Sequence, residues 1–160
     1  MLKKTVYITQ AAIIAAMYAA LTYLMAPISY GQLQIRVSEA LTILPFFTPA
    51  AIPGLFVGCF AANILGPNGL PDIIAGSFAT LIAAVMSRHI RKKWLVPLPP
   101  VLVNAVVIGL MLNYITKAPL LMTMLYIFAG QTISCYGLGY PLLLLLNRNK
   151  TKIFGKYSGK

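Results

Sequence analysis

The chain has 160 residues, of which 59% are hydrophobic and only 9% are charged. A soluble domain usually has about 25% charged residues, so this chain has too little polar surface to fold in water. Its 13 Lys and Arg residues against 2 acidic residues give a net charge of +11, but the basic residues gather at the chain ends and in one short cluster. That distribution is typical of membrane topology signals rather than of a nucleic-acid-binding surface. We therefore expect the lipid bilayer, and no nucleic acid, as a partner.

Long stretches without charge mark the expected membrane spans. A spanning helix needs about 20 apolar residues, and counting alone gives five spans. Pro45, Pro49 and Pro53 interrupt the second stretch, because proline lacks a backbone donor and disfavours helix at the residue before it. We therefore predict an all-α membrane protein with six transmembrane helices in a single domain, residues 1–160. The expected spans are approximately residues 5–26, 37–47, 53–65, 72–88, 95–116 and 119–147.

Three groups of basic residues test this count. They lie at Lys3 and Lys4, between residues 88 and 93, and between residues 148 and 156. Six spans place all three groups on one face, which the positive-inside rule makes cytoplasmic, whereas five spans place the N-terminus opposite the others. We expect a multi-pass protein of the cell (plasma) membrane with both termini cytoplasmic. The second helix, with roughly 11 residues, rises only about 17 Å, and such short helices between proline breaks often line a cavity.

Three ionisable residues lie within or beside the apolar stretches and are candidate binding residues, because such groups are costly in a membrane. Arg36 and Glu39 are three residues apart, which places them on one helix face. The alternative is a structural ion pair at the interface, with Arg36 extending toward the headgroups. Asp72 opens the fourth helix, where a carboxylate is favoured by the helix dipole and can cap free N–H groups, and it is also a candidate for binding.

The neutral polar and aromatic residues of the spans allow two interpretations. Asn63, Asn104 and Gln131 could form interhelical hydrogen bonds, each contributing about 1 kcal/mol or less, or could bind a ligand. Tyr30 and Tyr136 could stack on a flat ligand, or could pack and anchor helices. The chain has one His and two acidic residues, and it contains no nucleotide-binding loop and no metal-ligand or catalytic motif. We expect no enzymatic activity, no catalytic residue, no metal site and no cofactor in this chain.

The first helix carries two stripes of small residues at four-residue spacing. One stripe consists of Ala11, Ala15 and Ala19, and the other of Ala12, Ala16 and Ala20. Small residues allow another helix to approach closely, either within this bundle or from a partner, and the residues alone do not decide between these. A bundle with few converging polar side chains and no energy source of its own suits the substrate-binding part of a larger importer better than a complete carrier.

Several segments resemble the QueT family of queuosine-precursor transporters. The most specific is the pattern R-x-S-E-A-L-T at residues 36–42, preceded by Ser29-Tyr30-Gly31 and Gln34-Ile35. The apolar segments that also agree lie at residues 44–47, 51–59, 62–66 and 97–105. The resemblance runs from the first helix to about Leu146, which is nearly the whole chain.

This resemblance implies an S component of a prokaryotic energy-coupling-factor (ECF) importer. Such components have a six-helix fold, bind a vitamin-like substrate from outside and dock on a transmembrane coupling protein. Two ATPase subunits drive the complex, so ATP is used by the partners. Docking in this superfamily uses an alanine motif on the first helix, which here maps to either of the two stripes.

The substrate implied by the resemblance is a 7-deazaguanine, namely preQ0, preQ1 or queuine. A guanine-type edge offers N1–H and an exocyclic amine side by side, and one carboxylate can accept from both. On this hypothesis Glu39 accepts from that edge, Arg36 orients Glu39 or contacts O6, and Asp72 is a spare carboxylate for the amine of preQ1 or queuine. The remaining expected contacts are Asn63, Asn104 and Gln131 at the base edges, and Tyr30 or Tyr136 over the ring.

Two alternatives stay open at this point. One is an S component for a different vitamin. The other is a non-transport protein, such as a membrane assembly factor in which Arg36 and Glu39 form a structural pair.

Overall fold

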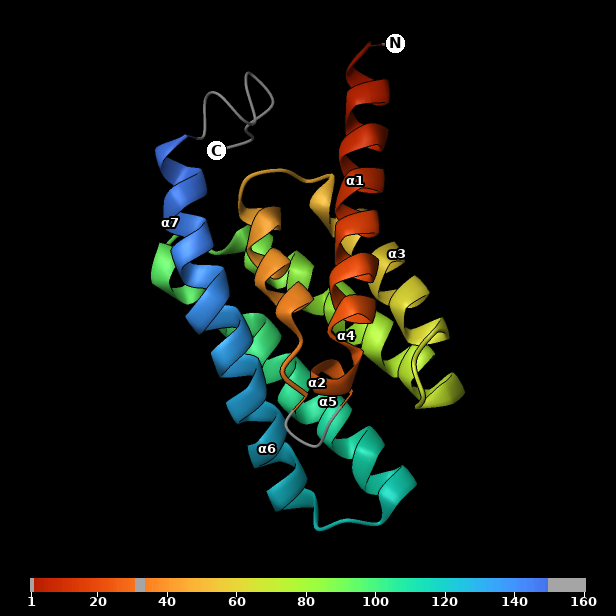
Figure 1. The fold of residues 1–160 in the computed structure, drawn as a ribbon. Coiled ribbons are helices and arrows are strands. Elements are labelled where there is room, and N and C mark those ends of the chain that lie inside the picture. The colour runs from red at the N-terminus through yellow and green to blue at the C-terminus, as the bar shows by residue number, and fades with distance from the viewer. Residues whose placement is uncertain (1, 31–33, 150–160) are drawn as a thin grey trace.

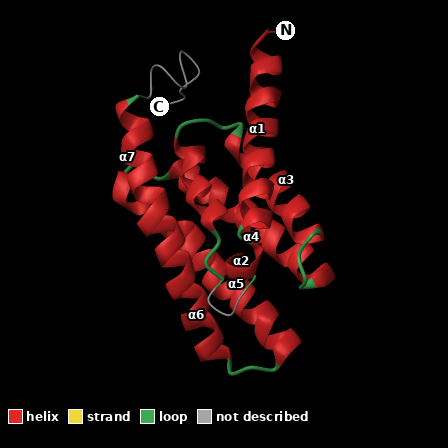
Figure 2. Ribbon diagram, in the orientation of Figure 1, coloured by secondary structure: helices red, strands yellow, loops and turns green. Residues whose placement is uncertain are grey.

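The computed structural model describes residues 2–30 and 34–149, and these residues form helices joined by short loops, with no strand among them (Figures 1 and 2). In chain order the α-helices and the irregular helices (η) are α1 (Leu2–Leu24), α2 (Ala26–Ser29), η1 (Val37–Phe46), α3 (Ala51–Ile64), α4 (Gly69–His89), η2 (Lys93–Leu95), α5 (Leu98–Thr116), α6 (Leu120–Thr132), η3 (Ile133–Gly139) and α7 (Tyr140–Arg148). The all-α prediction is therefore confirmed.

Four helical stretches are long and apolar enough to cross a membrane, by length and composition. They are Lys4–Leu24, Gly69–His89, Lys93–Thr116 and Leu120–Arg148. Two shorter apolar helices, Val37–Phe46 and Ala51–Ile64, lie between the first two. A helix lies near each of the six predicted segments, but only four of the described helical stretches are long and apolar enough to cross a membrane. The proline-rich segment separates η1 from α3. The chain is a helical membrane bundle.

The short helix η1 lies at the centre of the bundle. It packs against α1, α3, α4, α7 and η3, while α1, α3, α4, α5 and α6 pack in succession around it (Figure 1). Every residue from Ser38 to Pro45 is buried. η1 is a 3-10 helix of 10 residues, so it rises about 20 Å, slightly more than the α-helix that we expected. Polar side chains on η1 are consequently shielded from lipid on all sides.

A second irregular helix, η3, lies directly against η1. It is a π-helical stretch between α6 and α7. This conformation is rare in proteins, but where it occurs it often lies at a functional site. A Cβ added to Gly139 at its end would lie 3.2 Å from the backbone oxygen of Ala40, so the two backbones approach closely here. The two irregular helices therefore meet one residue after Glu39.

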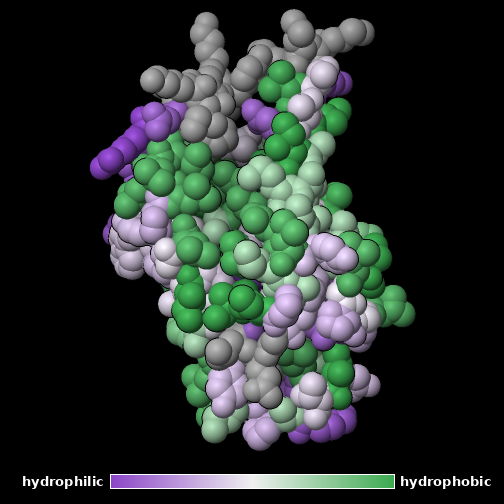
Figure 3. Space-filling view, in the orientation of Figure 1, coloured by the Kyte–Doolittle hydropathy of each residue, from purple (hydrophilic) through white to green (hydrophobic). Residues whose placement is uncertain are grey.

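The outer surface of the bundle is apolar. Figure 3 shows hydrophobic side chains over most of the middle of the face in view. Helices α1, α3, α4, α5, α6 and α7 each carry large exposed hydrophobic residues, including Ile13, Met17, Phe60, Phe78, Leu110, Leu125 and Leu145. Since water does not favour such a surface, it is the face that contacts lipid.

Candidate functional site

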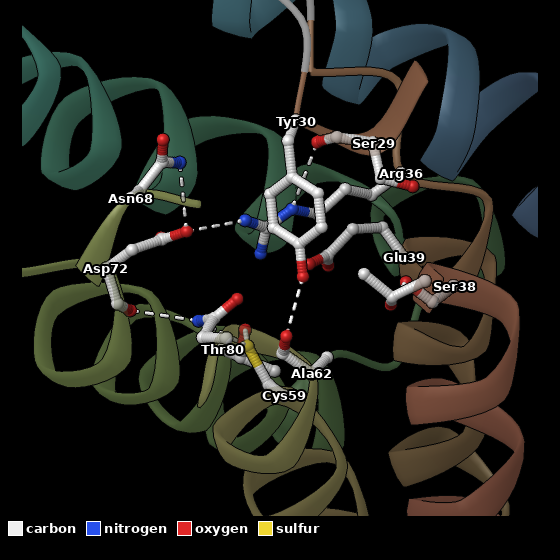
Figure 4. A network of polar contacts seen from close by, with 12 residues as sticks. Ser29, Tyr30, Arg36, Ser38, Glu39, Cys59, Ala62, Asn68, Asp72 and Thr80 are labelled. Carbon is white, nitrogen blue, oxygen red and sulfur yellow. Dashed lines mark hydrogen bonds and ion pairs between the residues drawn. The ribbon is translucent and has the colours of Figure 1, made fainter. Parts of the chain in front are cut away.

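Three ionisable side chains are buried together between η1 and α4. Arg36, Glu39 and Asp72 are 3%, 1% and 0% exposed, and within the described residues no other Arg, Lys, Asp or Glu is buried. Arg36 immediately precedes η1, Glu39 lies in the first turn of η1, and Asp72 lies in the first turn of α4 (Figure 4). Burying charged groups is costly unless they are paired and hydrogen-bonded, so their partners decide what this cluster can do.

Arg36 is paired with Asp72. Its Nη2 lies 3.0 Å from Asp72 Oδ2, and its Nε donates to the backbone oxygen of Ser29 at 3.4 Å. The guanidinium also lies over the ring of Tyr30, 5.1 Å from the centroid. Asn68 donates to the same Oδ2 atom of Asp72 at 3.1 Å. The ion pair therefore ties the segment before η1 to the start of α4.

This pairing decides between interpretations that the sequence left open. The alternative of a structural pair between Arg36 and Glu39 is not formed, because Arg36 has an extended backbone (φ −89°, ψ 103°) outside η1 and its side chain bonds to α4 instead. Asp72 lies in the first turn of α4 as expected, but its Oδ2 accepts from Arg36 and Asn68 rather than from a backbone N–H group of that helix. Asp72 uses one carboxylate oxygen for Arg36 and leaves Oδ1 without a partner among the described residues.

Glu39 has a different environment from Asp72. Its Oε1 accepts a hydrogen bond from the hydroxyl of Tyr18 on α1, at 2.5 Å, and the side chain of Asn104 on α5 lies beside the same carboxyl group. Its Oε2 is buried and has no hydrogen-bond partner among the described residues. One turn further along α1, Thr22 bonds to Ser38 at 2.6 Å. Glu39 is thus held in place by α1 while one strong acceptor remains free.

Asn63 belongs to the same cluster. Its Nδ2 donates to the backbone oxygen of Asp72 at 2.9 Å, and its Oδ1 has no partner among the described residues. A Cβ added to Gly76 would lie 2.6 Å from Asn63 Nδ2 and 2.9 Å from Asp72 Oδ1. The absence of a side chain at Gly76 therefore leaves the space that these two polar groups occupy.

The other predicted residues lie at different distances from this centre. Gln131 is buried and accepts from Cys135 Sγ at 3.6 Å, and the same Sγ lies 3.8 Å from the backbone oxygen of Glu39. Tyr30 donates to the backbone oxygen of Ala62 at 2.7 Å. Tyr136 is partly buried on η3, and no hydrogen bond joins it to the described residues of the cluster. The structure thus brings together Arg36, Glu39, Asn63, Asp72, Asn104 and Tyr30, with Gln131 adjoining through Cys135.

A cavity of about 330 Å³ adjoins the cluster. Its walls come from the segment before η1, from the turn between α3 and α4, and from the facing ends of α5 and α6. The lining residues are Tyr30, Gln34, Asn68, Leu112, Thr116, Ala118, Pro119, Met122, Thr123 and Tyr126. Ligand sites commonly have volumes of about 300–1,000 Å³ with mostly apolar walls and a few polar groups. This cavity fits that description, and Tyr30 and Asn68 belong both to its wall and to the cluster.

Sequence reasoning missed several residues of the site. Tyr18 is the clearest case. It lies four residues before Thr22, so two polar groups share one face of an apolar helix, and this spacing is the signal that could have identified it. Gln34 gave no such signal, although it is buried, lines the cavity and has a left-handed backbone (φ 44°) that is uncommon outside glycine. Asn68, which bonds to Asp72 and lines the cavity, was not among the predicted residues.

Comparison with known proteins supports the resemblance noted above. The profile of the family described as QueT transporter matches residues 8–148. The chain belongs to the QueT transporter family. The queuosine precursor transporter QueT of Lactococcus lactis subsp. cremoris (strain MG1363) is 40% identical over 81 residues, which are 49% of this chain and 47% of that protein. The match thus spans about half the length of that relative, and no solved structure matches the chain. QueT proteins form a family of transporters, not of enzymes.

In this QueT family member the two alanine stripes of α1 face different surroundings. Cβ atoms added to Gly54 and Gly58 of α3 would each lie 2.7 Å from a backbone oxygen of α1, that of Ala11 and Ala15 respectively. That stripe therefore packs inside the bundle, where the glycines allow α1 and α3 to approach closely. The other stripe is exposed, and consists of Ala12, Ala16 and Ala20.

Proposed function

We propose that this QueT family member is the substrate-binding membrane subunit of an ECF-type importer for a queuosine precursor, a 7-deazaguanine such as preQ1, preQ0 or queuine. The observation that carries the proposal is the buried Glu39 carboxylate, with Oε1 held by Tyr18 and Oε2 free. A guanine-type base presents N1–H and an exocyclic amine side by side, and such donors form strong, charge-assisted bonds to a carboxylate. A buried acceptor also discriminates against bases that lack these donors.

The arrangement of the cavity supports binding from outside the cell. Figure 1 places the start of α1 and the end of α7 at one end of the bundle and the loop between α5 and α6 at the other. The basic residues of the chain ends make the first end cytoplasmic. The cavity involves Ala118 and Pro119 of the α5–α6 loop, so on this topology it lies toward the outer side. The cavity shares Tyr30 and Asn68 with the buried cluster, through the contacts of Tyr30 with Arg36 and of Asn68 with Asp72.

Import requires energy, which on this proposal comes from partner subunits. The exposed stripe at Ala12, Ala16 and Ala20 is the surface on which a transmembrane coupling protein docks, because small side chains permit a close helix crossing. Two ATPase subunits attached to that protein hydrolyse ATP. The stripe at Ala11 and Ala15, which α3 covers, takes no part in docking.

The proposed substrate class is tested by ligand-dependent stabilisation of the detergent-purified protein. A ligand that binds only the folded state raises the melting temperature by mass action. We expect preQ1, preQ0 or queuine to raise it, with no shift from riboflavin or thiamine. A shift with another vitamin alone would replace the substrate and keep the importer. No shift with any compound, for protein shown to be folded, would contradict a role in substrate binding.

A further inference from the structure

Arg88 joins two helices at the cytoplasmic end of the bundle. It lies in the last turn of α4 and belongs to the basic group that marks the cytoplasmic side. Its Nη1 donates to the backbone oxygens of Pro45 at 3.0 Å and of Phe46 at 3.4 Å. These are the last two residues of η1, so a partly buried cation of α4 bonds to the end of the central helix.

The carbonyl groups of Pro45 and Phe46 need donors from outside η1. A helix leaves its last carbonyl groups without intrahelical donors, and the residues that follow η1 do not supply them. The N–H of Thr48 bonds to an earlier carbonyl group of η1, Pro49 has no N–H, and the N–H of Ala50 bonds to the side chain of Thr48. Since buried carbonyl groups without a partner are costly, the Arg88 guanidinium supplies the donors that the proline-rich segment lacks.

The two ends of η1 are attached to the two ends of α4. At the outer end, Arg36 immediately before η1 pairs with Asp72 in the first turn of α4. At the cytoplasmic end, Arg88 bonds to the last residues of η1. Asp72 and Arg88 lie about 24 Å apart along an α-helix, which is close to the length of about 20 Å of η1. The two helices therefore lie side by side and are held together at both ends.

The polar side chains of η1 itself lie near its start. They belong to Ser38, Glu39 and Thr42, and they bond to α1, to η3 and within η1. Residues 43–46 have apolar side chains, which pack but do not form directional bonds. The cytoplasmic half of η1 therefore takes its position along the helix axis from packing and from the contact with Arg88.

Resting on the proposed function, we propose that Arg88 is a positioning residue for the ligand site, although it does not contact the ligand. It holds η1 in one axial position against α4, and so holds Glu39 where the free Oε2 of that carboxylate meets the ligand. Without Arg88, η1 shifts among several positions. The measured Kd then rises as the fraction of chains with Glu39 in place falls.

The affinity of the Arg88→Met variant tests this role. Calorimetric titration of the detergent-purified protein uses whichever of preQ1, preQ0 and queuine binds the unaltered protein best. Methionine keeps an unbranched side chain and removes the donors. Because a hydrogen bond to a charged group corresponds to a factor of about 10 to 150 in an equilibrium constant, we expect Kd to rise at least about tenfold. Arg88→Lys keeps a charged donor and should leave Kd within about threefold of the unaltered protein.

Ser87→Ala is the matched control, because Ser87 precedes Arg88 on α4 and also donates to a backbone oxygen, that of Val96 at 3.0 Å, which lies outside η1. We expect its Kd to be unchanged. An equal rise in Ser87→Ala and Arg88→Met would overturn the proposal, since any loosening of this end of α4 would then weaken binding. An unchanged Kd in folded Arg88→Met would overturn the positioning role and leave the proposed function intact. Binding of none of the three ligands by the unaltered protein would overturn both.

If Arg88→Met does not fold, hydrogen–deuterium exchange of the unaltered protein decides. Coupling between two sites is reciprocal, so a bound ligand must also hold the cytoplasmic end of η1 more firmly. The amides of Phe47 and Thr48 report on this end, because both bond to the backbone oxygen of Leu44. We expect the ligand to slow their exchange at least about threefold. Exchange that the ligand leaves unchanged would overturn the proposal.

Discussion

The hydrogen bond between Tyr18 and Glu39 makes a sharp prediction about stability. Tyr18→Phe removes one hydroxyl from a fully buried ring and leaves Glu39 Oε1, now bonded at 2.5 Å, without that donor. Hydrogen bonds to charged groups contribute about 1.5–3 kcal/mol, so we expect the free energy of unfolding to fall by about that amount. The ring still fills its space, and no cavity adds to the cost.

Tyr30→Phe is the matched control, because Tyr30 donates to a neutral backbone oxygen, that of Ala62, at 2.7 Å. Its loss should cost about 0.5–1.5 kcal/mol. Both variants are compared with the unaltered protein by reversible unfolding with sodium dodecyl sulfate in mixed micelles. If Tyr18→Phe costs no more than Tyr30→Phe, the bond is not to an ionised carboxylate, and the argument that Glu39 is a buried anion fails.

Four further substitutions test the packing and the charges. Ala16→Phe, on the exposed stripe, should abolish co-purification with the coupling protein and leave ligand binding unchanged. Ala15→Phe, on the stripe that α3 covers, should impair folding. If both variants lose co-purification and ligand binding equally, the assignment of the two stripes is contradicted. Gly58→Ala should lower the free energy of unfolding by about 1–3 kcal/mol, because its Cβ would lie 2.7 Å from the oxygen of Ala15; an unchanged unfolding curve would refute that close contact. Arg36→Met leaves Asp72 without its cation and should lower the free energy of unfolding by about 3–5 kcal/mol. A loss below about 1 kcal/mol, measured by unfolding with sodium dodecyl sulfate, would show that the pair is not buried.

The order of the helices and their approximate positions could be predicted from the sequence because they depend on local signals. Charge-free stretches gave the long helices, and the spacing of Pro45, Pro49 and Pro53 separated η1 from α3. The observed bounds of η1, Val37–Phe46, differ by one residue from the expected 37–47. The 3-10 and π conformations of η1 and η3 could not be predicted, because they depend on how these two helices pack against each other.

The members of the site were easier to predict than their partners. Glu39, Arg36 and Asp72 stood out because ionisable residues are rare in an apolar chain. Which carboxylate pairs with Arg36 depends on the direction of its side chain and on the position of α4, neither of which is local. The Tyr18–Glu39 bond likewise joins residues 21 apart in the sequence. The two alanine stripes could be separated only once Gly54 and Gly58 were located against α1.

The most direct test of the central claim is the affinity of Glu39→Gln for its best-binding 7-deazaguanine. The amide keeps the shape of the side chain and an oxygen that can accept from Tyr18, so the fold should be retained. Loss of the charge removes a bond to a charged acceptor, and we expect Kd to rise by about 10-fold to 150-fold. An unchanged Kd in the folded variant would contradict the claim that Glu39 recognises the base.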